Sequence, residues 1–220
     1  MKIHFSIDDV GGSLRYLIQN RPDSIFDLRL FGKLRDWRSR FGLLVTLYCF
    51  VEAGGYSVLQ IPKEYTKEFD ENSDWLKFGF HGRCGDYPFL QENNYVESFM
   101  KMESAKKNLC AGTTSILRLH NWMATPEQVK YLSDKGVTAL LYRDDDAMPY
   151  DDSGCFYQNG MAFWRTDVCV ERLASVSPIL LCVGNSRVIA FTHESCFDRE
   201  IHRIEEALKL YVRNGYLFIT

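Results

Sequence analysis

Short apolar runs alternate with amphipathic segments along the whole chain. The apolar runs are rich in β-branched and aromatic residues, which favours strands, and the segments between them have the spacing of helices. Strands are expected at residues 3–7, 43–49, 76–80, 115–119, 139–142, 188–192 and 216–219. This alternation is typical of an α/β protein built around a mostly parallel sheet or barrel.

Two helices have clear signals, and one segment departs from the alternation. Thr125 can cap a helix in which Pro126 takes the first position and Gln128 completes a capping box. The last helix carries one apolar face, formed by Ile201, Ile204, Leu208 and Tyr211. Residues 148–172 contain glycines and aromatic residues without regular spacing, which indicates an irregular hairpin insertion near the mouth of a site.

Composition narrows the class of protein. With 220 residues, 46% apolar and 25% charged, the chain has the composition of one globular domain, expected over residues 1–220. The net charge of -3 and the mixing of basic with acidic residues argue against a nucleic-acid partner, and the composition argues against a membrane protein. The N-terminus enters a strand without an export signal, and the 7 cysteines form no CxxC pair. We therefore predict a cytoplasmic protein with reduced cysteines.

Polar residues follow several of the predicted strands. Asp8 and Asp9 end the first strand, and His81, His120 and His193 follow three later ones. Active sites of parallel α/β proteins lie at the carboxyl ends of the strands, so these side chains are expected to converge. Taken alone, the aspartate pair has a simpler interpretation, in which one residue caps a helix and the other pairs with a surface cation.

The converging residue types suit a metal. One aspartate and two histidines leave coordination positions open on a divalent ion, with zinc as first choice and iron, cobalt or nickel as alternatives. Such an ion activates water, and the second aspartate can take the proton. The sequence thus predicts a metal held by His81, His120 and one aspartate of the Asp8-Asp9 pair, with the other aspartate as base.

Several motifs resemble those of the polysaccharide deacetylases, the NodB homology family. The matching segments are Phe5-Ser6-Ile7-Asp8-Asp9, Phe78-Gly79-Phe80-His81-Gly82, Arg118-Leu119-His120 and Ile189-Ala190-Phe191-Thr192-His193. The resemblance implies a distorted (β/α) barrel of about seven parallel strands that hydrolyses an N- or O-acetyl group on a carbohydrate. It also implies Asp8 as general base, Asp9 and His81 as metal ligands and His193 as general acid, with Arg118 orienting the base or the substrate.

One departure affects the metal ligands. The family's second motif is H-x-x-x-H, but Gly85 stands four residues after His81. His120 is the preferred replacement, because the YdjC-like carbohydrate deacetylases similarly use an aspartate and two distant histidines, and Asp86 is the second choice. A carbohydrate-binding barrel that has lost the metal is a further alternative.

Other residues near the predicted strand ends offer less specific signals. Contacts with the substrate are expected from Arg118, Trp122, Asp86, Arg143 and Trp164. The acidic run at residues 144–146 is interpreted as a loop at the site mouth, with a glycosyltransferase metal clamp as the alternative. Glu194 offers a carboxylate for a glycosidase on the same barrel, and Cys196 is interpreted as an inert thiol.

Overall fold

The predicted alternation of strands and helices is present in the computed structural model, which describes residues 1–109, 114–143, 148–173 and 184–220. The strands are β1 (Lys2–Val10), β2 (Val45–Phe50), β3 (Glu52–Ala53), β4 (Tyr56–Ser57), β5 (Leu76–Gly82), β6 (Ile116–Leu117), β7 (Ala139–Tyr142), β8 (Cys155–Gln158), β9 (Met161–Arg165), β10 (Val168–Cys169), β11 (Arg187–His193) and β12 (Leu217–Ile219). The helices are α1 (Gly12–Asn20), α2 (Arg29–Phe41), α3 (Thr66–Glu71), α4 (Tyr95–Leu109), α5 (Pro126–Asp134) and α7 (Glu194–Arg213). All seven predicted strands are confirmed.

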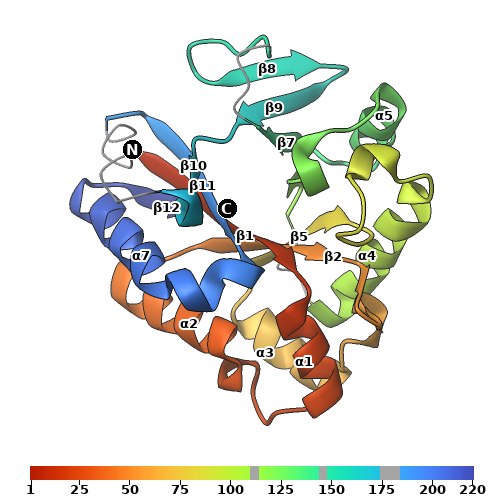
Figure 1. Ribbon diagram of the computed structural model, residues 1–220, viewed down its shortest axis with the longest axis vertical. Coiled ribbons are helices and arrows are strands. Elements are labelled where there is room, and N and C mark those ends of the chain that lie inside the picture. Colours follow the sequence, from red (N-terminus) through yellow and green to blue (C-terminus); the bar gives the residue numbers. More distant parts are fainter. Residues whose placement is uncertain (110–113, 144–147, 174–183) are drawn as a thin grey trace.

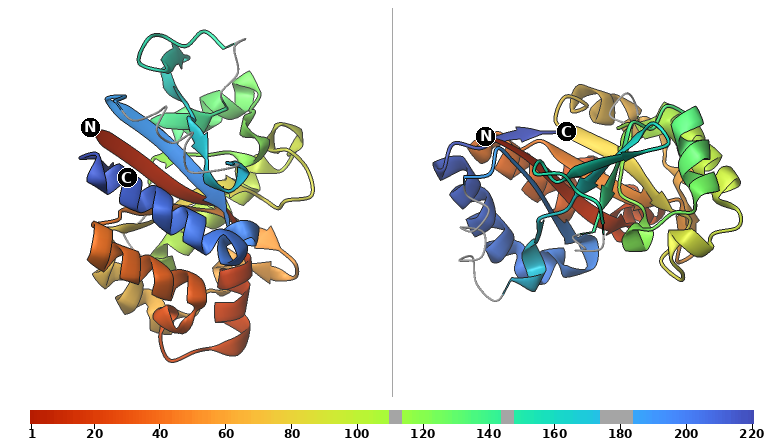
Figure 2. Two further views of the ribbon diagram at one scale, coloured as in Figure 1. Left: turned by 60° about the vertical axis from the view of Figure 1, so that its left-hand side comes forward. Right: turned by 90° about the horizontal axis from the view of Figure 1, so that it is seen from above.

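The larger sheet is parallel and has the order β10-β11-β1-β2-β5, with β12 also paired to β1. Figures 1 and 2 show β1 and β11 side by side in the middle of the molecule. Both strands are buried over most of their length, as expected for parallel strands covered on both faces. Because β1 aligns Asp8 with His193 of β11, the polar ends of the two strands lie next to each other.

The second sheet has the order β6-β7-β9-β8, in which β8 is antiparallel to β9 and the other pairs are parallel. The hairpin of β8 and β9 confirms the predicted insertion. The prediction missed that β9 also pairs with β7, because Gly160 directly before this short run obscures its strand pattern.

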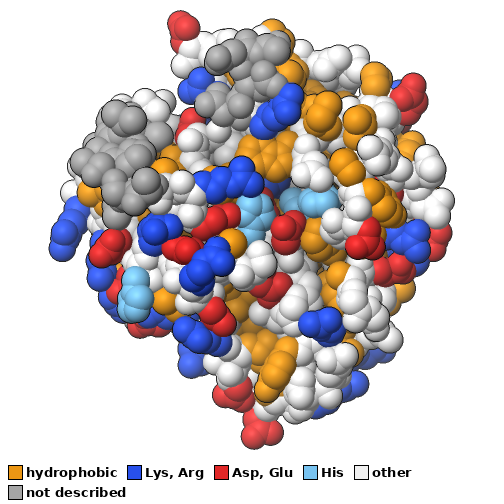
Figure 3. All heavy atoms as spheres, viewed as in Figure 1, with side chains coloured by type: hydrophobic (Ala, Val, Ile, Leu, Met, Phe, Trp, Pro, Cys, Tyr) orange, Lys and Arg blue, Asp and Glu red, His pale blue; other side chains and the backbone are white. Residues whose placement is uncertain are grey.

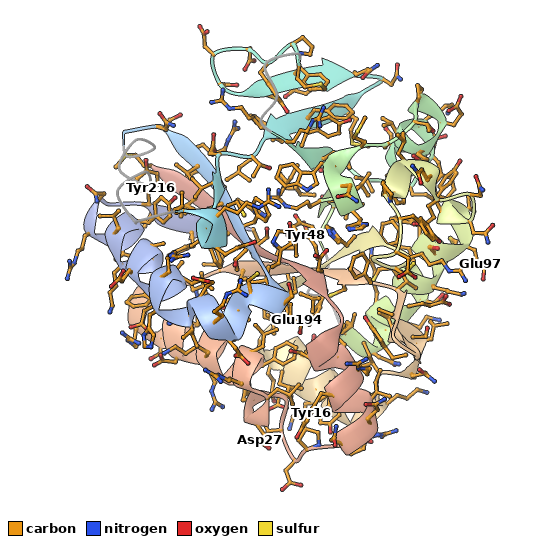
Figure 4. The ribbon with its side chains drawn as sticks, viewed as in Figure 1. Tyr16, Asp27, Tyr48, Glu97, Glu194 and Tyr216 are labelled. Carbon is orange, nitrogen blue, oxygen red and sulfur yellow. The ribbon has the colours of Figure 1, made fainter. Side chains whose placement is uncertain are left out.

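The two sheets face a common interior. The hydroxyl of Tyr48 on β2 donates a hydrogen bond to the main-chain oxygen of Ile116 on β6 at 3.1 Å, and Figure 4 shows Tyr48 between the two sheets. No ladder joins β5 to β6 within the described residues, so the wall is interrupted there. The fold is therefore α/β, and the barrel is distorted as expected.

Helices cover the outside of this barrel. Figure 1 shows α1, α2, α3 and α7 below the larger sheet and α4 and α5 to the right. The capping box of Thr125 and Gln128 opens α5 as predicted, and α7 buries Ile204, Leu208 and Tyr211. Within the described ranges, no helix has the length and apolar character needed to cross a membrane.

Candidate active site

The predicted metal ligands Asp9, His81 and His120 and the predicted acid His193 line one cavity of about 620 Å³ at the carboxyl ends of the strands. They come from the ends of β1, β5 and β11 and from the 3-10 turn His120–Trp122 that follows β6. Figure 3 shows histidine side chains around a hollow in the middle of this face. The topology thus gathers side chains that are more than a hundred residues apart in sequence.

The end of β1 has an irregular backbone. The pairing of β1 with β2 shifts register between Ile7 and Val10, and Asp9 has a φ of 59°, in the left-handed region. Successive side chains of a regular strand point to opposite faces. The irregularity lets Asp9 reach the cavity while Asp8, one residue earlier, points into the protein interior and is 1% exposed.

Asp8 forms an ion pair with Arg118 inside the barrel. The guanidinium Nε lies 3.1 Å from Asp8 Oδ2, although the two groups are not aligned as a hydrogen bond. Burial raises the pKa of Asp8, and the charges of Arg118, His81 and His193 act in the opposite direction. A carboxyl group with a raised pKa suits a general base working near neutral pH.

Arg118 is fully buried, which corrects the expectation that it contacts the substrate. Its Nη1 donates to Thr166 Oγ1 at 2.8 Å, and its guanidinium carbon lies 4.5 Å from the ring centre of Phe191. These contacts and the ion pair with Asp8 hold the guanidinium inside the barrel. Arg118 therefore contacts the Asp8 carboxylate and does not line the cavity.

Asp9 and His81 form an acceptor pair that fits a cation. His81 Nδ1 contacts the main-chain oxygen of Arg118 and therefore carries the ring proton in the neutral imidazole. The lone pair of Nε2 then faces Asp9 Oδ1 at 3.0 Å. Two acceptors at this distance repel unless a proton or a metal ion lies between them. Tetrahedral zinc with bonds of about 2.0–2.1 Å holds its ligand atoms roughly 3.3 Å apart, close to the spacing observed.

His120 lies beside this pair at a greater distance. Its Nδ1 donates to the main-chain oxygen of Tyr87 at 2.9 Å, which leaves the lone pair of Nε2 for a ligand. The rings of His81 and His120 have centres 5.5 Å apart. The ligand atoms of Asp9, His81 and His120 do not all lie within 4.8 Å of one another. These residues fit a divalent ion held closely by Asp9 and His81, with His120 as a more distant third ligand.

His193 is paired with a glutamate that the sequence analysis missed. Its Nδ1 donates a hydrogen bond to Glu171, which lies in the turn after β10. Burial alone would lower the pKa of His193, but Glu171 raises it. In turn, His193 outweighs the effect of burial on Glu171 and lowers the pKa of that carboxyl to about 2. A carboxylate–imidazolium pair is an effective proton donor. No motif in the sequence indicated Glu171.

Glu194 has a structural position that no pattern predicted. The main-chain N–H groups of Gly11, Gly12 and Ser13 donate to its carboxylate at 2.7–2.8 Å. Figure 4 shows Glu194 at the start of α7, near the beginning of α1. A carboxylate is stabilised at a helix N-terminus by these free N–H groups and by the helix dipole. This capping role corrects the alternative in which Glu194 acts as a glycosidase acid.

The predicted substrate contacts divide into two groups. Trp122 and Arg143 line the cavity. Asp86 and Trp164 are not among its lining residues, so their predicted roles are corrected. Trp164 instead packs under the Arg187 guanidinium, whose carbon lies 3.4 Å from the ring centre, beside a different cavity at the start of β1.

Asp86 is exposed in the loop after β5. The start of this loop is held against β3, because the N–H of Glu52 donates to the main-chain oxygen of Arg83 at 2.8 Å and the two side chains form an ion pair. This pairing along β3 explains why Asp86 does not reach the cavity. Residues 144–146, expected as a loop at the mouth, lie outside the described residues.

No protein-family model matches the sequence, and no curated protein does either. Solved structures match the fold. A peptidoglycan N-acetylglucosamine deacetylase gives a TM-score of 0.60 at 14% identity, covering 100% of this chain and 85% of that one. A family 4 acetyl xylan esterase from Clostridium thermocellum, in complex with a cobalt ion, gives 0.54 at 12% identity, covering 100% and 88%. A 4-alpha-glucanotransferase from Thermococcus litoralis gives 0.67 at 11% identity, covering 100% and 39%. The chain therefore has the barrel fold expected from its motifs.

Proposed function

We propose that this chain, acting as one domain over residues 1–220, is a divalent-metal-dependent hydrolase that removes an acetyl group from a carbohydrate in the cytoplasm. The observation that carries the proposal is the acceptor pair of His81 Nε2 and Asp9 Oδ1, 3.0 Å apart on the wall of a cavity that His193 also lines. The barrel fold supports the proposal, because solved deacetylases and acetyl esterases share it.

Asp9, His81 and His120 are the residues that would hold the ion, with zinc preferred and iron, cobalt or nickel as alternatives. When bound, such an ion polarises the carbonyl of the acetyl group and lowers the pKa of a water molecule. The chain fixes the tautomers of both histidines through main-chain oxygens, since each Nδ1 contacts one. This arrangement presents each Nε2 as a ligand atom.

Asp8 is the proposed base, which takes the proton of the attacking water. Its burial raises its pKa and makes the carboxylate a stronger proton acceptor than an exposed aspartate. Arg118 keeps the carboxylate in one orientation from inside the barrel, through the ion pair at 3.1 Å.

His193 is the proposed acid, which delivers a proton from Nε2 to the departing amine or alcohol. Glu171 holds Nδ1 and stabilises the protonated ring, so the proton for the leaving group comes from the free side of the imidazole. Trp122 and Arg143 are the proposed contacts with the sugar, because both line the cavity.

A second candidate function is a glycosidase or transglycosylase on the same barrel, favoured by the likeness to the glucanotransferase. That chemistry needs two carboxyl groups flanking one bond and no metal. Asp9 and Asp167 both line the cavity, but the main-chain N–H of Ile189 donates to Asp167 at 2.8 Å. Chelator-insensitive cleavage of an aryl glycoside, lost in Asp167→Asn, would favour this candidate.

The deacetylase proposal is tested with the purified protein, its metal content and a panel of N- and O-acetylated sugars. We expect acetate release that is lost with a chelator and restored by zinc or cobalt. Asp8→Asn is expected to keep the metal and lose turnover, whereas His81→Ala loses both. Full acetate release by Asp8→Asn would eliminate the proposed base, and acetate release that no chelator affects would contradict the metal.

A further inference from the structure

A second group of side chains that can bind a metal lies on the cavity wall, beside the proposed metal site of Asp9, His81 and His120. It consists of Cys169 at the end of β10, Glu171 in the following turn and His193 at the end of β11. One ligand atom of each lies within 4.8 Å of those of the other two, and no other group of three is this close among the described residues. The parallel pairing of β10 with β11, with Cys169 opposite Phe191, brings the three together.

The chemistry of this group differs from that of Asp9 and His81. A thiolate, a carboxylate and an imidazole are all zinc ligands, and the thiolate selects soft ions over magnesium, calcium or manganese. Cys169 and His193 line the cavity, so an ion can enter from it and keep an open coordination position toward it. Asp9 does not belong to this group, which makes the two positions separate.

We propose that Cys169, Glu171 and His193 form a second, inhibitory site for a thiophilic divalent ion such as Zn²⁺ or Cd²⁺. The proposal that an ion binds here depends only on this geometry. Its inhibitory effect rests on the proposed function, because it assumes that His193 supplies the proton for the leaving group. An ion at this site removes the proton that the acid needs.

The exchange of ion for protons is balanced in charge. Without the ion, the Cys169 thiol lies within 4.8 Å of the Glu171 carboxylate, and Glu171 holds the protonated ring of His193. The ion enters with two positive charges, and one proton leaves the thiol while another leaves the imidazolium. The net charge of the group is zero before and after. The exchange therefore places no additional net charge in these partly buried surroundings.

The Glu171 carboxylate is held by His193, whose main-chain N–H donates to Oε2 at 3.3 Å and whose ring contacts Oε1. Arg203 donates to the main-chain oxygen of Glu171 at 3.1 Å and not to its side chain. His193 is therefore the partner whose proton the ion displaces. Glu171 and His193 form a hydrogen-bonded acid in one state, and together with Cys169 they form a metal site in the other.

The binding test uses Cd²⁺ alone as the probe, followed by the ultraviolet charge-transfer absorption of the cadmium–thiolate bond. We expect a band that corresponds to one equivalent of bound Cd²⁺ and that persists in His81→Ala, because its ligands lie outside the Asp9–His81 pair. Cys169→Ser should remove the band and weaken this binding by at least about a hundredfold, since it deletes a ligand atom. Cys196→Ser is the matched control, because its thiol lies near His193 in sequence but outside the group, and it should keep the band.

The second arm measures acetate release during titration with Cd²⁺ or excess Zn²⁺. We expect inhibition of the parent protein, and inhibition of Cys169→Ser only at concentrations about a hundredfold higher, each measured relative to that protein's own rate without added ion. A band or an inhibition constant that Cys169→Ser leaves unchanged overturns the proposal. A single bound ion that is lost in His81→Ala also overturns it. If no acetate is released by any form, the proposed function fails while the cadmium band still decides the site.

Discussion

Arg118 Nε lies 3.1 Å from Asp8 Oδ2, and the two side chains are 0% and 1% exposed. The pair joins the two sheets, because Asp8 belongs to β1 and Arg118 directly follows β6. It also leaves buried polar atoms without hydrogen-bond partners among the described residues, namely Asp8 Oδ2 and Arg118 Nε and Nη2. The same contact therefore orients the proposed base and makes the interior dependent on two opposite charges.

Arg118→Leu is expected to destabilise the protein by about 3–5 kcal/mol, because it leaves the Asp8 charge buried and uncompensated. The free energy of unfolding from urea denaturation measures this loss. The double variant Asp8→Asn/Arg118→Leu should regain much of the stability, since it removes both charges. A loss below about 1 kcal/mol in the single variant would show that Asp8 does not depend on Arg118.

The carboxylate of Glu194 ties the end of β1 to the start of α7. Glu194→Gln replaces one acceptor oxygen with an NH₂ group, which faces main-chain donors from Gly11–Ser13. We expect a loss of about 1–3 kcal/mol in the free energy of unfolding. The dissociation constant of the metal should rise as well, because Asp9 stands two residues before Gly11 in a left-handed conformation.

Calorimetric metal titration and urea denaturation check both effects of Glu194→Gln. Glu200→Gln is the matched control, because Glu200 lies on the same helix and pairs only with Arg199 and Arg203 among the ion pairs of the described chain. Equal metal affinity in the Glu194→Gln and parent proteins would contradict an influence of the cap on Asp9.

The barrel and the ends of its strands could be predicted well from the sequence, because apolar strands and the polar residues that follow them are local patterns. Asp9, His81, His120 and His193 could be placed on one face from topology alone. Alternation within a strand also explains an error, since Trp164 belongs to a predicted aromatic segment but lies beside another cavity. Whether an aromatic residue faces the site depends on strand register, which local patterns do not contain.

Glu171 and Glu194 could not be predicted as partners of the site. The Glu171 contact joins residues 22 positions apart through β10–β11 pairing, and the Glu194 contact joins residues more than 180 positions apart where the start of α7 meets the start of α1. The pairing of Arg118 with Asp8 is similar, because it crosses between two sheets. Such contacts depend on the assembled tertiary structure, and a single sequence carries no local signal for them.

His81 and His120, the two histidines of the proposed metal site, should contribute unequally to metal binding. His81 Nε2 faces Asp9 at 3.0 Å, whereas the ligand atom of His120 lies farther from one or both of these atoms. His81→Ala is expected to weaken zinc binding by more than about a hundredfold, and His120→Ala by about tenfold. Equilibrium dialysis against a zinc-buffered series measures both constants. A larger loss in His120→Ala would show that His120, and not His81, is the principal imidazole ligand.

The Glu171–His193 pair sets the expected pH dependence of turnover. Glu171 raises the pKa of His193 against the effect of burial, so the ring stays protonated to higher pH. A general acid must carry its proton, and activity is therefore lost as the pH rises through the pKa of His193. In Glu171→Gln, burial remains without the carboxylate charge, the pKa of His193 falls, and the alkaline limb of kcat/KM shifts to lower pH.

The acidic limb responds differently to this substitution. It follows the proposed base, Asp8, which must be deprotonated and which keeps its ion pair with Arg118 in Glu171→Gln. Profiles of kcat/KM against pH for the parent and variant proteins should therefore differ on the alkaline side and coincide on the acidic side. A uniform loss of activity at every pH, with both limbs in place, would mean that Glu171 only supports the local structure and does not tune the acid.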